Sequence, residues 1–174
     1  MVIWITGISG TGKTTLGKHF YKFFKKENPS TIYFDGDKFR SIFKNDIKYS
    51  LKDRNTNAQR LTALVKHLSD QKINIVISAN ITTFSFRKWC RKNIKNYIEV
   101  YIETTKKILI QRDYKNLYKM DLQKKIKNVV GVDLPFKKPN GCDIYLKNNK
   151  SKDTLLKNYN KILNLIKKKK KKIH

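Results

Sequence analysis

The residues with the clearest chemical potential lie near the start of the chain, in the segment Gly7-Ile8-Ser9-Gly10-Thr11-Gly12-Lys13-Thr14. This segment matches the phosphate-binding pattern G-x-x-x-x-G-K-[ST] at every defined position. Its glycines let successive backbone N–H groups point inward at phosphate oxygens, and the start of a following helix adds partial positive charge. We therefore expect the whole segment to bind ATP, with the Lys13 ammonium at the β- and γ-phosphates and the Thr14 hydroxyl on Mg²⁺.

Two carboxylates, Asp35 and Asp37, follow the next short apolar segment, where parallel sheets present ligand groups. One could orient Mg²⁺ or its waters while the other accepts the proton of an acceptor hydroxyl, because phosphoryl transfer uses both roles. Lys13, Asp35 and Asp37 are thus the catalytic candidates, and Asp35 is a second candidate metal ligand. The alternative for Asp37 is structural, since its carboxylate precedes a short helix and could cap it.

The phosphate-binding segment requires a strand before it and a helix after it, and the sequence predicts both elements. Residues 2–6 form an apolar, β-branched run, and residues 14–26 follow at helical spacing. The same patterns predict strands at 31–34, 73–79, 97–102 and 143–146, and helices at 53–71, 105–112 and 152–166. Strands that alternate with helices predict an α/β fold, a parallel β-sheet flanked by helices.

The length of 174 residues fits one domain, which we place at 1–166 and follow with a polylysine tail at 167–174. The net charge of +27 attracts anionic ligands and nucleic acid alike, so it does not distinguish them. A general enrichment in Lys, Asn and Ile is the alternative explanation of this charge. The aromatic-interleaved basic motif of RNA-binding modules is missing, so nucleic acid is not an expected partner.

The cysteines Cys90 and Cys142 lie far apart in the sequence and form no C-x-x-C pair. They indicate neither a zinc site nor a disulfide framework, which fits a reducing compartment. The first residues carry no basic stretch before the apolar ones, and no apolar run approaches the ~18 residues needed to span a bilayer. We expect a cytoplasmic protein that does not associate with a membrane. The sequence is compatible with a homodimer as well as with a monomer.

Five segments, taken in order, resemble the adenylylsulfate kinase family over nearly the whole chain: VIWITGISGTGKTTL, FDGDKFR, YSLKDRNTNAQR, RDYKNLYK and GVDLPF. The resemblance implies a P-loop kinase fold with a parallel sheet and a mobile lid, here at about 113–139. It implies MgATP as co-substrate and a small-molecule nucleotide acceptor, adenosine 5′-phosphosulfate, which is phosphorylated on its 3′-hydroxyl in sulfate assimilation.

The resemblance also assigns acceptor-binding roles to Asp37, Arg40, Tyr49, Arg54 and Asn57. Arg40 closes the pattern D-G-D-x-x-R, and Tyr49 stands where the family stacks a phenylalanine on the base. Arg54 and Asn57 lie three positions apart, hence on one face of a helix start, and guanidinium groups suit phosphate and sulfate oxygens. The alternative for Arg54, and for Arg60 on the same predicted helix, is a solvated position on the helix surface.

In the lid pattern, the resemblance assigns Arg112 to ATP and Lys115 to the acceptor, while Asn116 replaces a glycine of the family. Asparagine tolerates the left-handed conformation, so we expect the turn at Asn116 to survive. A lid that closes over the site excludes water. The alternative is a basic loop without a ligand.

The chain departs from the family at two places that face the acceptor. Where the family has F-I-S-P this chain has Asn80-Ile81-Thr82-Thr83, and where the family has N-F-T-G-I-D it has Asn128-Val129-Val130-Gly131-Val132-Asp133. We assign Ile81, Thr82, Val129 and Val130 to the acceptor, with one aromatic wall of the base pocket missing. Losing such a wall typically costs ~1–3 kcal/mol of stacking.

This altered pattern resembles a branch of the family found with capsule-sugar modification, whose acceptor is cytidine diphosphoramidate. Adenosine phosphosulfate is the first expectation because of the breadth of the family, and cytidine diphosphoramidate is the alternative. A more distant alternative is a basic nucleic-acid-binding P-loop ATPase. A GTPase is disfavoured because the segment nearest to N-K-x-D, at residues 149–153, has its aspartate one position late.

Overall fold

The computed structural model describes residues 1–80, 84–113, 116, 120, 127–150, 155 and 159–171. In this part of the chain a five-stranded sheet has the order β2-β3-β1-β4-β5, and all its pairings are parallel. The strands are β1 (Val2–Thr6), β2 (Ile32–Asp35), β3 (Ile75–Ser78), β4 (Tyr97–Glu103) and β5 (Ile144–Lys147). The predicted parallel α/β sheet is confirmed.

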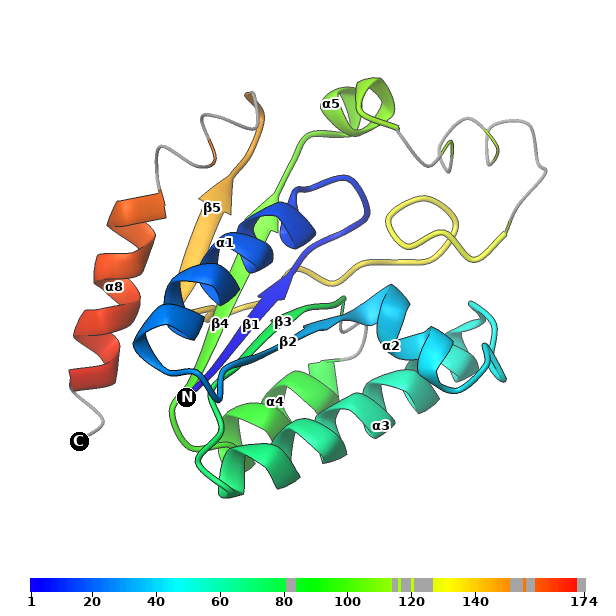
Figure 1. Ribbon diagram of the computed structural model, residues 1–174. Coiled ribbons are helices and arrows are strands. Elements are labelled where there is room, and N and C mark those ends of the chain that lie inside the picture. Colours follow the sequence, from blue (N-terminus) through cyan, green and yellow to red (C-terminus); the bar gives the residue numbers. More distant parts are fainter. Residues whose placement is uncertain are drawn as a thin grey trace.

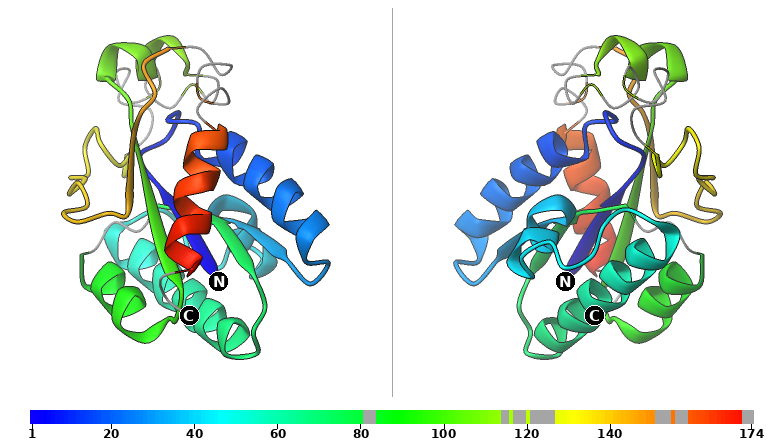
Figure 2. Two further views of the ribbon diagram at one scale, coloured as in Figure 1. Left: turned by 90° about the vertical axis from the view of Figure 1, so that its left-hand side faces the viewer. Right: turned by 90° about the vertical axis from the view of Figure 1, so that its right-hand side faces the viewer.

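Helices cover both faces of this sheet (Figures 1 and 2). The helices of the described part of the chain are α1 (Lys13–Glu27), α2 (Gly36–Ile42), α3 (Leu51–Asp70), α4 (Phe84–Asn93), α5 (Lys106–Gln111) and α8 (Tyr159–Lys171). Helices α1 and α8 lie on one face, and α3 and α4 on the other.

Strand β1 is the central strand of the sheet, and its side chains contribute to the two apolar clusters that lie on opposite faces of the sheet. Its side chains alternate between the faces, as a strand requires. Ile3 and Ile5 pack with the apolar residues of α1 and α8, whereas Val2 and Trp4 pack with those of α3 and α4. All four side chains are fully buried, so the end of β1, where the phosphate-binding segment begins, is fixed from both faces.

Helix α4 was not predicted from periodicity, and its buried face explains why. This face carries Arg87, which is buried and lies 3.9 Å from the carboxylate of the buried Glu99 on β4. Arg91 also pairs with Glu99, at 3.1 Å. A charged residue on the inner face weakens the apolar period that marks an amphipathic helix.

The predicted helix at 152–166 begins later and ends later in the structure. Residues 152–154 and 156–158 lie outside the described part of the chain, and α8 continues through Lys171. The described part of the predicted tail is therefore helical, and the boundary between domain and tail stays a prediction. Among the described residues, no helix is long and apolar enough to cross a membrane.

Candidate active site

The loop between β1 and α1 adopts a conformation that only its glycines permit. A Cβ atom at Gly7 would lie 2.5 Å from the Ile102 carbonyl oxygen, so any side chain there would clash with the backbone. Gly12 precedes α1 with a φ of 97°, and no acidic residue lies in the first turn of that helix. The positive end of α1 is thus uncompensated by a carboxylate of its own and suits a phosphate.

Lys13 lies over this loop. Its Nζ atom donates a hydrogen bond to the Ile8 carbonyl at 2.7 Å, and the Thr11 hydroxyl donates to the same carbonyl at 3.0 Å. The ammonium is therefore held at the centre of the turn by the backbone that would wrap a phosphate. The role of Lys13 at the phosphates of ATP stays a prediction.

Asp35 connects the loop to helix α2. Its Oδ2 atom accepts a hydrogen bond from the Thr14 hydroxyl at 2.9 Å, and its Oδ1 atom accepts from the backbone N–H groups of Asp37 and Lys38 at 3.1 and 3.5 Å. Asp35 is thus the N-cap of α2, and the cap considered for Asp37 was wrong: Asp37 lies inside the first turn of α2. The cap belongs to Asp35 because the chain leaves β2 in an extended conformation at that residue.

Thr14 and Asp35 fit a magnesium ion by their chemistry, since a hydroxyl and a carboxylate 2.9 Å apart offer the hard oxygen ligands that Mg²⁺ prefers. No cluster of three or more His, Cys, Asp or Glu residues occurs in the described part of the chain, so phosphate oxygens and water would supply the remaining ligands. The Tyr33 hydroxyl lies behind Asp35 at 3.4 Å, and burial raises the pKa of Tyr33 to about 12. Tyr33 therefore stays a neutral donor.

One cavity of about 640 Å³ extends from this loop to the first half of α3. The predicted residues that line it are Ser9, Gly10, Gly12, Lys13, Thr14, Asp35, Asp37, Arg40, Tyr49, Arg54, Asn57, Arg112, Val129 and Val130. Gly7, Ile8 and Thr11 belong to the loop behind it, and Ile81, Thr82 and Lys115 lie outside the described residues. Residues predicted from five separate segments thus share one cavity, because the carboxyl ends of parallel strands meet at one edge of the sheet.

Two guanidinium groups converge on Tyr49 at one end of this cavity. Arg40 Cζ lies 4.6 Å and Arg54 Cζ 5.4 Å from the centre of the Tyr49 ring. Arg40 is 5% exposed and donates to the Lys48 carbonyl at 2.6 Å, so its position is fixed by the protein. Burial, and after it the charge of Arg40, lowers the pKa of Arg54. Two close like charges are stabilised when an anion lies between them.

Buried amide oxygens face the same cavity. Among the described residues, the Oδ1 atoms of Asn57 and Asn80 are buried without a hydrogen-bond partner, and both side chains line the cavity. A buried polar atom that the protein leaves unpaired is costly, and a ligand or ordered water commonly satisfies it. The predicted role of Asn57 therefore has a physical basis that its spacing alone did not provide.

Asn148, at the carboxyl end of β5, was missed by the sequence analysis. Its Nδ2 atom donates to the Thr11 carbonyl at 2.9 Å, and its own carbonyl accepts from the Arg112 guanidinium at 3.1 Å. Asn148 thus joins the phosphate-binding loop to the arginine predicted to serve ATP. The position of Asn148 just after a predicted strand could have identified it, although the strand pattern at residues 143–146 is the weakest of the five in the sequence.

Two further features concern the predicted lid and the acceptor loop. Asn116 has a φ of 53°, so the left-handed turn expected at this position is present. Val129 and Val130 are buried, and the preceding residue, Asn128, accepts a hydrogen bond from Arg54 Nη2 through its carbonyl at 2.7 Å. The valines therefore form a wall of the cavity next to the paired arginines.

Comparisons with known proteins agree with this geometry. The family model described as adenylylsulphate kinase matches residues 1–147. A cytidine diphosphoramidate kinase of Campylobacter jejuni is 39% identical over 147 residues, which cover 84% of this chain and 85% of that protein. An adenylyl-sulfate kinase of Buchnera aphidicola is 32% identical over 168 residues, or 95% of this chain and 80% of that protein.

Among solved structures, this fold is similar to an APS kinase of Mycobacterium tuberculosis in complex with AMPPNP and APS. The TM-score is 0.81 at 26% sequence identity, and the match covers 95% of this chain and 96% of that one.

Proposed function

Because the chain belongs to the adenylylsulphate kinase family, and is thus a kinase with an alcohol group as acceptor, we propose that it phosphorylates the ribose 3′-hydroxyl of a nucleotide whose 5′ end carries a mixed anhydride. MgATP is the phosphate donor. The observation that carries this proposal is the single cavity in which the phosphate-binding loop and the paired arginines meet. A donor at one end and an anionic acceptor at the other would bring the acceptor hydroxyl to the γ-phosphorus of ATP, with ADP as the leaving group.

The hydrogen bonds of Asp35 support a different role for each of the two aspartates in this proposal. Both carboxylate oxygens of Asp35 already accept hydrogen bonds, from Thr14 and from the N–H groups of α2, so this group suits metal orientation. Mg²⁺ bound beside Thr14 would neutralise charge on the transferring phosphoryl group. Asp37 lines the cavity next to these residues and is the candidate base for the acceptor hydroxyl. Lys13 stabilises the charge that develops on the γ-phosphate.

For the acceptor we place cytidine diphosphoramidate first and adenosine phosphosulfate second, the reverse of the order expected from the breadth of the family. The relative named for the cytidine compound is 39% identical, against 32% for the adenylyl-sulfate kinase of Buchnera aphidicola. The buried Val129 and Val130 add support, because two small apolar side chains offer less stacking surface than an aromatic ring. A pyrimidine needs less of that surface than a purine.

The proposal retains three predicted acceptor residues that lie outside the described part of the chain, namely Ile81, Thr82 and Lys115. It also retains the domain at 1–166 and the lid at about 113–139.

The test is direct. The purified protein is incubated with MgATP and each acceptor in turn, and the products are separated by mass and their phosphate position assigned by NMR. Transfer to the 3′-hydroxyl of the cytidine acceptor, with a higher kcat/KM than for adenosine phosphosulfate, supports the proposal. Transfer to neither compound, together with tight and steeply salt-dependent RNA binding, supports the nucleic-acid-binding alternative instead.

A further inference from the structure

The loop of residues 127–134 is closed by one carboxylate. The two oxygens of Asp133 accept hydrogen bonds from the backbone N–H groups of Asn128 and Val129. The backbone hydrogen bond from Leu134 N to Val129 O, at 3.1 Å, lies beside them. Asn128 has a φ of 68°, a conformation that a non-glycine residue seldom adopts without support. Asp133 supplies that support from within the same loop.

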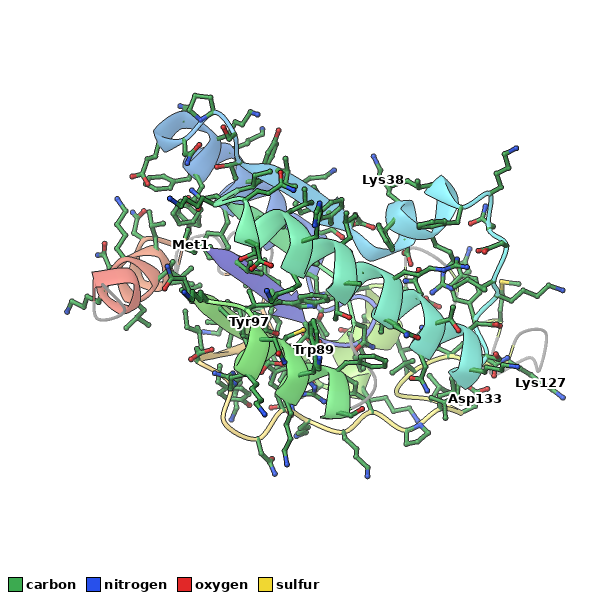
Figure 3. All side chains as sticks on the ribbon, turned by 90° about the horizontal axis from the view of Figure 1, so that it is seen from below. Met1, Lys38, Trp89, Tyr97, Lys127 and Asp133 are labelled. Carbon is green, nitrogen blue, oxygen red and sulfur yellow. The ribbon has the colours of Figure 1, made fainter. Side chains whose placement is uncertain are left out.

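The closed loop contacts the active site on two sides. On one side the Asn128 carbonyl accepts a hydrogen bond from Arg54 Nη2 at 2.7 Å. On the other side Gly131 lies against Ile8 of the phosphate-binding loop, where an added Cβ would be 3.1 Å from two side-chain carbons. Lys127 and Asp133 lie beside the first turn of α3, which carries Arg54 (Figure 3).

We propose that Asp133 is a positioning residue for the acceptor: it holds the loop in the one shape that places the Asn128 carbonyl on Arg54 and the wall of Val129 and Val130 in the cavity. This inference rests on the proposed function, because it assumes that this end of the cavity binds the acceptor. Asp133 itself is exposed and does not line the described cavity, so its effect passes through the backbone that it holds.

Charge and geometry favour this role over a purely structural one. A carboxylate that accepts two backbone N–H groups makes charge-assisted hydrogen bonds, which are stronger than neutral ones. Losing them frees Asn128 to leave its left-handed conformation, and its carbonyl then turns away from Arg54. The hydrophobic core is not involved, because no member of either core cluster lies in the loop.

The experiment compares Asp133→Ala and Asp133→Asn with the wild type in steady-state kinetics. We expect Asp133→Ala to raise the acceptor KM at least about tenfold while the ATP KM changes less than about twofold, which corresponds to ~1.4 kcal/mol of acceptor binding alone. Asp133→Asn keeps one acceptor oxygen and should recover part of the loss. Asp70→Ala, which removes an exposed carboxylate paired with Lys66 at the end of α3, is the matched control and should change neither KM.

A second pair of variants tests the contact with Ile8. Gly131 and Gly141 have similar positive φ values, 88° and 75°, but a Cβ at Gly141 would meet nothing within 4 Å. Gly131→Ala should therefore raise the acceptor KM more than Gly141→Ala, although both carry the same kind of backbone strain.

Equal changes in the two KM values of Asp133→Ala, or no change in either at an unaltered melting temperature, would overturn the assignment. If the wild-type protein phosphorylates no nucleotide acceptor, the proposed function fails separately. Calorimetric titration with adenosine 5′-phosphosulfate and with cytidine 5′-diphosphate then tests Asp133 by binding alone. A dissociation constant that Asp133→Ala raises supports the positioning role, and one that it leaves unchanged contradicts it.

Discussion

Replacing Val129 with phenylalanine should shift the base preference of the enzyme toward adenine. Val129 is 6% exposed and lines the cavity. The adjacent Asn128 carbonyl lies 2.7 Å from Arg54 Nη2, and the same guanidinium lies 5.4 Å from the centre of the Tyr49 ring. The Arg54 guanidinium therefore contacts both the Tyr49 ring and the backbone next to Val129. An aromatic ring at residue 129 would enter the cavity near Tyr49.

The expected magnitude follows from stacking. An aromatic partner contributes ~1–3 kcal/mol per stacked base, and the larger purine gains more than a pyrimidine. We expect the ratio of kcat/KM for adenosine phosphosulfate to that for cytidine diphosphoramidate to rise about tenfold, or ~1.4 kcal/mol. Because Val129 is buried, the larger side chain also strains its surroundings, which typically costs ~1–3 kcal/mol of stability.

The assay presents both acceptors to the same enzyme with saturating MgATP and measures the ratio of products by mass. The matched control is Val132→Phe, which makes the same change in the same loop at a residue outside the described cavity lining. A melting curve for each variant separates misfolding from altered preference. A ratio unchanged in Val129→Phe, with both variants folded, would refute the assumption that residues 49 and 129 enclose the base.

Three further outcomes are expected. Lys13→Ala should lower kcat more than about tenfold and leave the melting temperature unchanged, because the ammonium contacts the loop carbonyl rather than the core; a smaller loss means that Lys13 contributes under ~1.4 kcal/mol. Arg54→Ala and Asn57→Ala should each raise the KM of the acceptor and leave the KM of ATP unchanged. Asn57→Ala should not lower the melting temperature, because the buried Oδ1 atom of Asn57 is unpaired within the described structure. Asn148→Ala should lower the free energy of unfolding by about 1–3 kcal/mol in urea titration, because the Thr11 carbonyl loses a buried donor; an unchanged urea midpoint would contradict this.

Several features of the fold and site were predictable because their signals are local. The strand at 2–6, the phosphate-binding loop and the helix after it are contiguous in the sequence. The spacing of glycine, lysine and threonine in the loop is specific to phosphate-binding loops of this kind. The parallel sheet followed from strands alternating with helices, and the strands run at nearly the predicted residues. Helix α4 escaped the same reasoning because its buried face contains Arg87, whose partner Glu99 lies on another element.

By itself the sequence determined which residues could do chemistry: a phosphate-binding loop, two aspartates after the second strand, an arginine on α2, and an arginine and an asparagine near the start of α3. Only the three-dimensional structure decided which contacts they make. It made Asp35 rather than Asp37 the cap of α2, brought Asn148 to the Thr11 carbonyl across 137 positions, and set Asp133 to hold the loop beside Arg54. The Asn148 contact depends on strand register and on the packing of distant segments. The Asp35 and Asp133 contacts are close in sequence and depend on the backbone conformation at the end of β2 and in the loop of residues 127–134. Neither kind of contact leaves a periodic pattern in the chain.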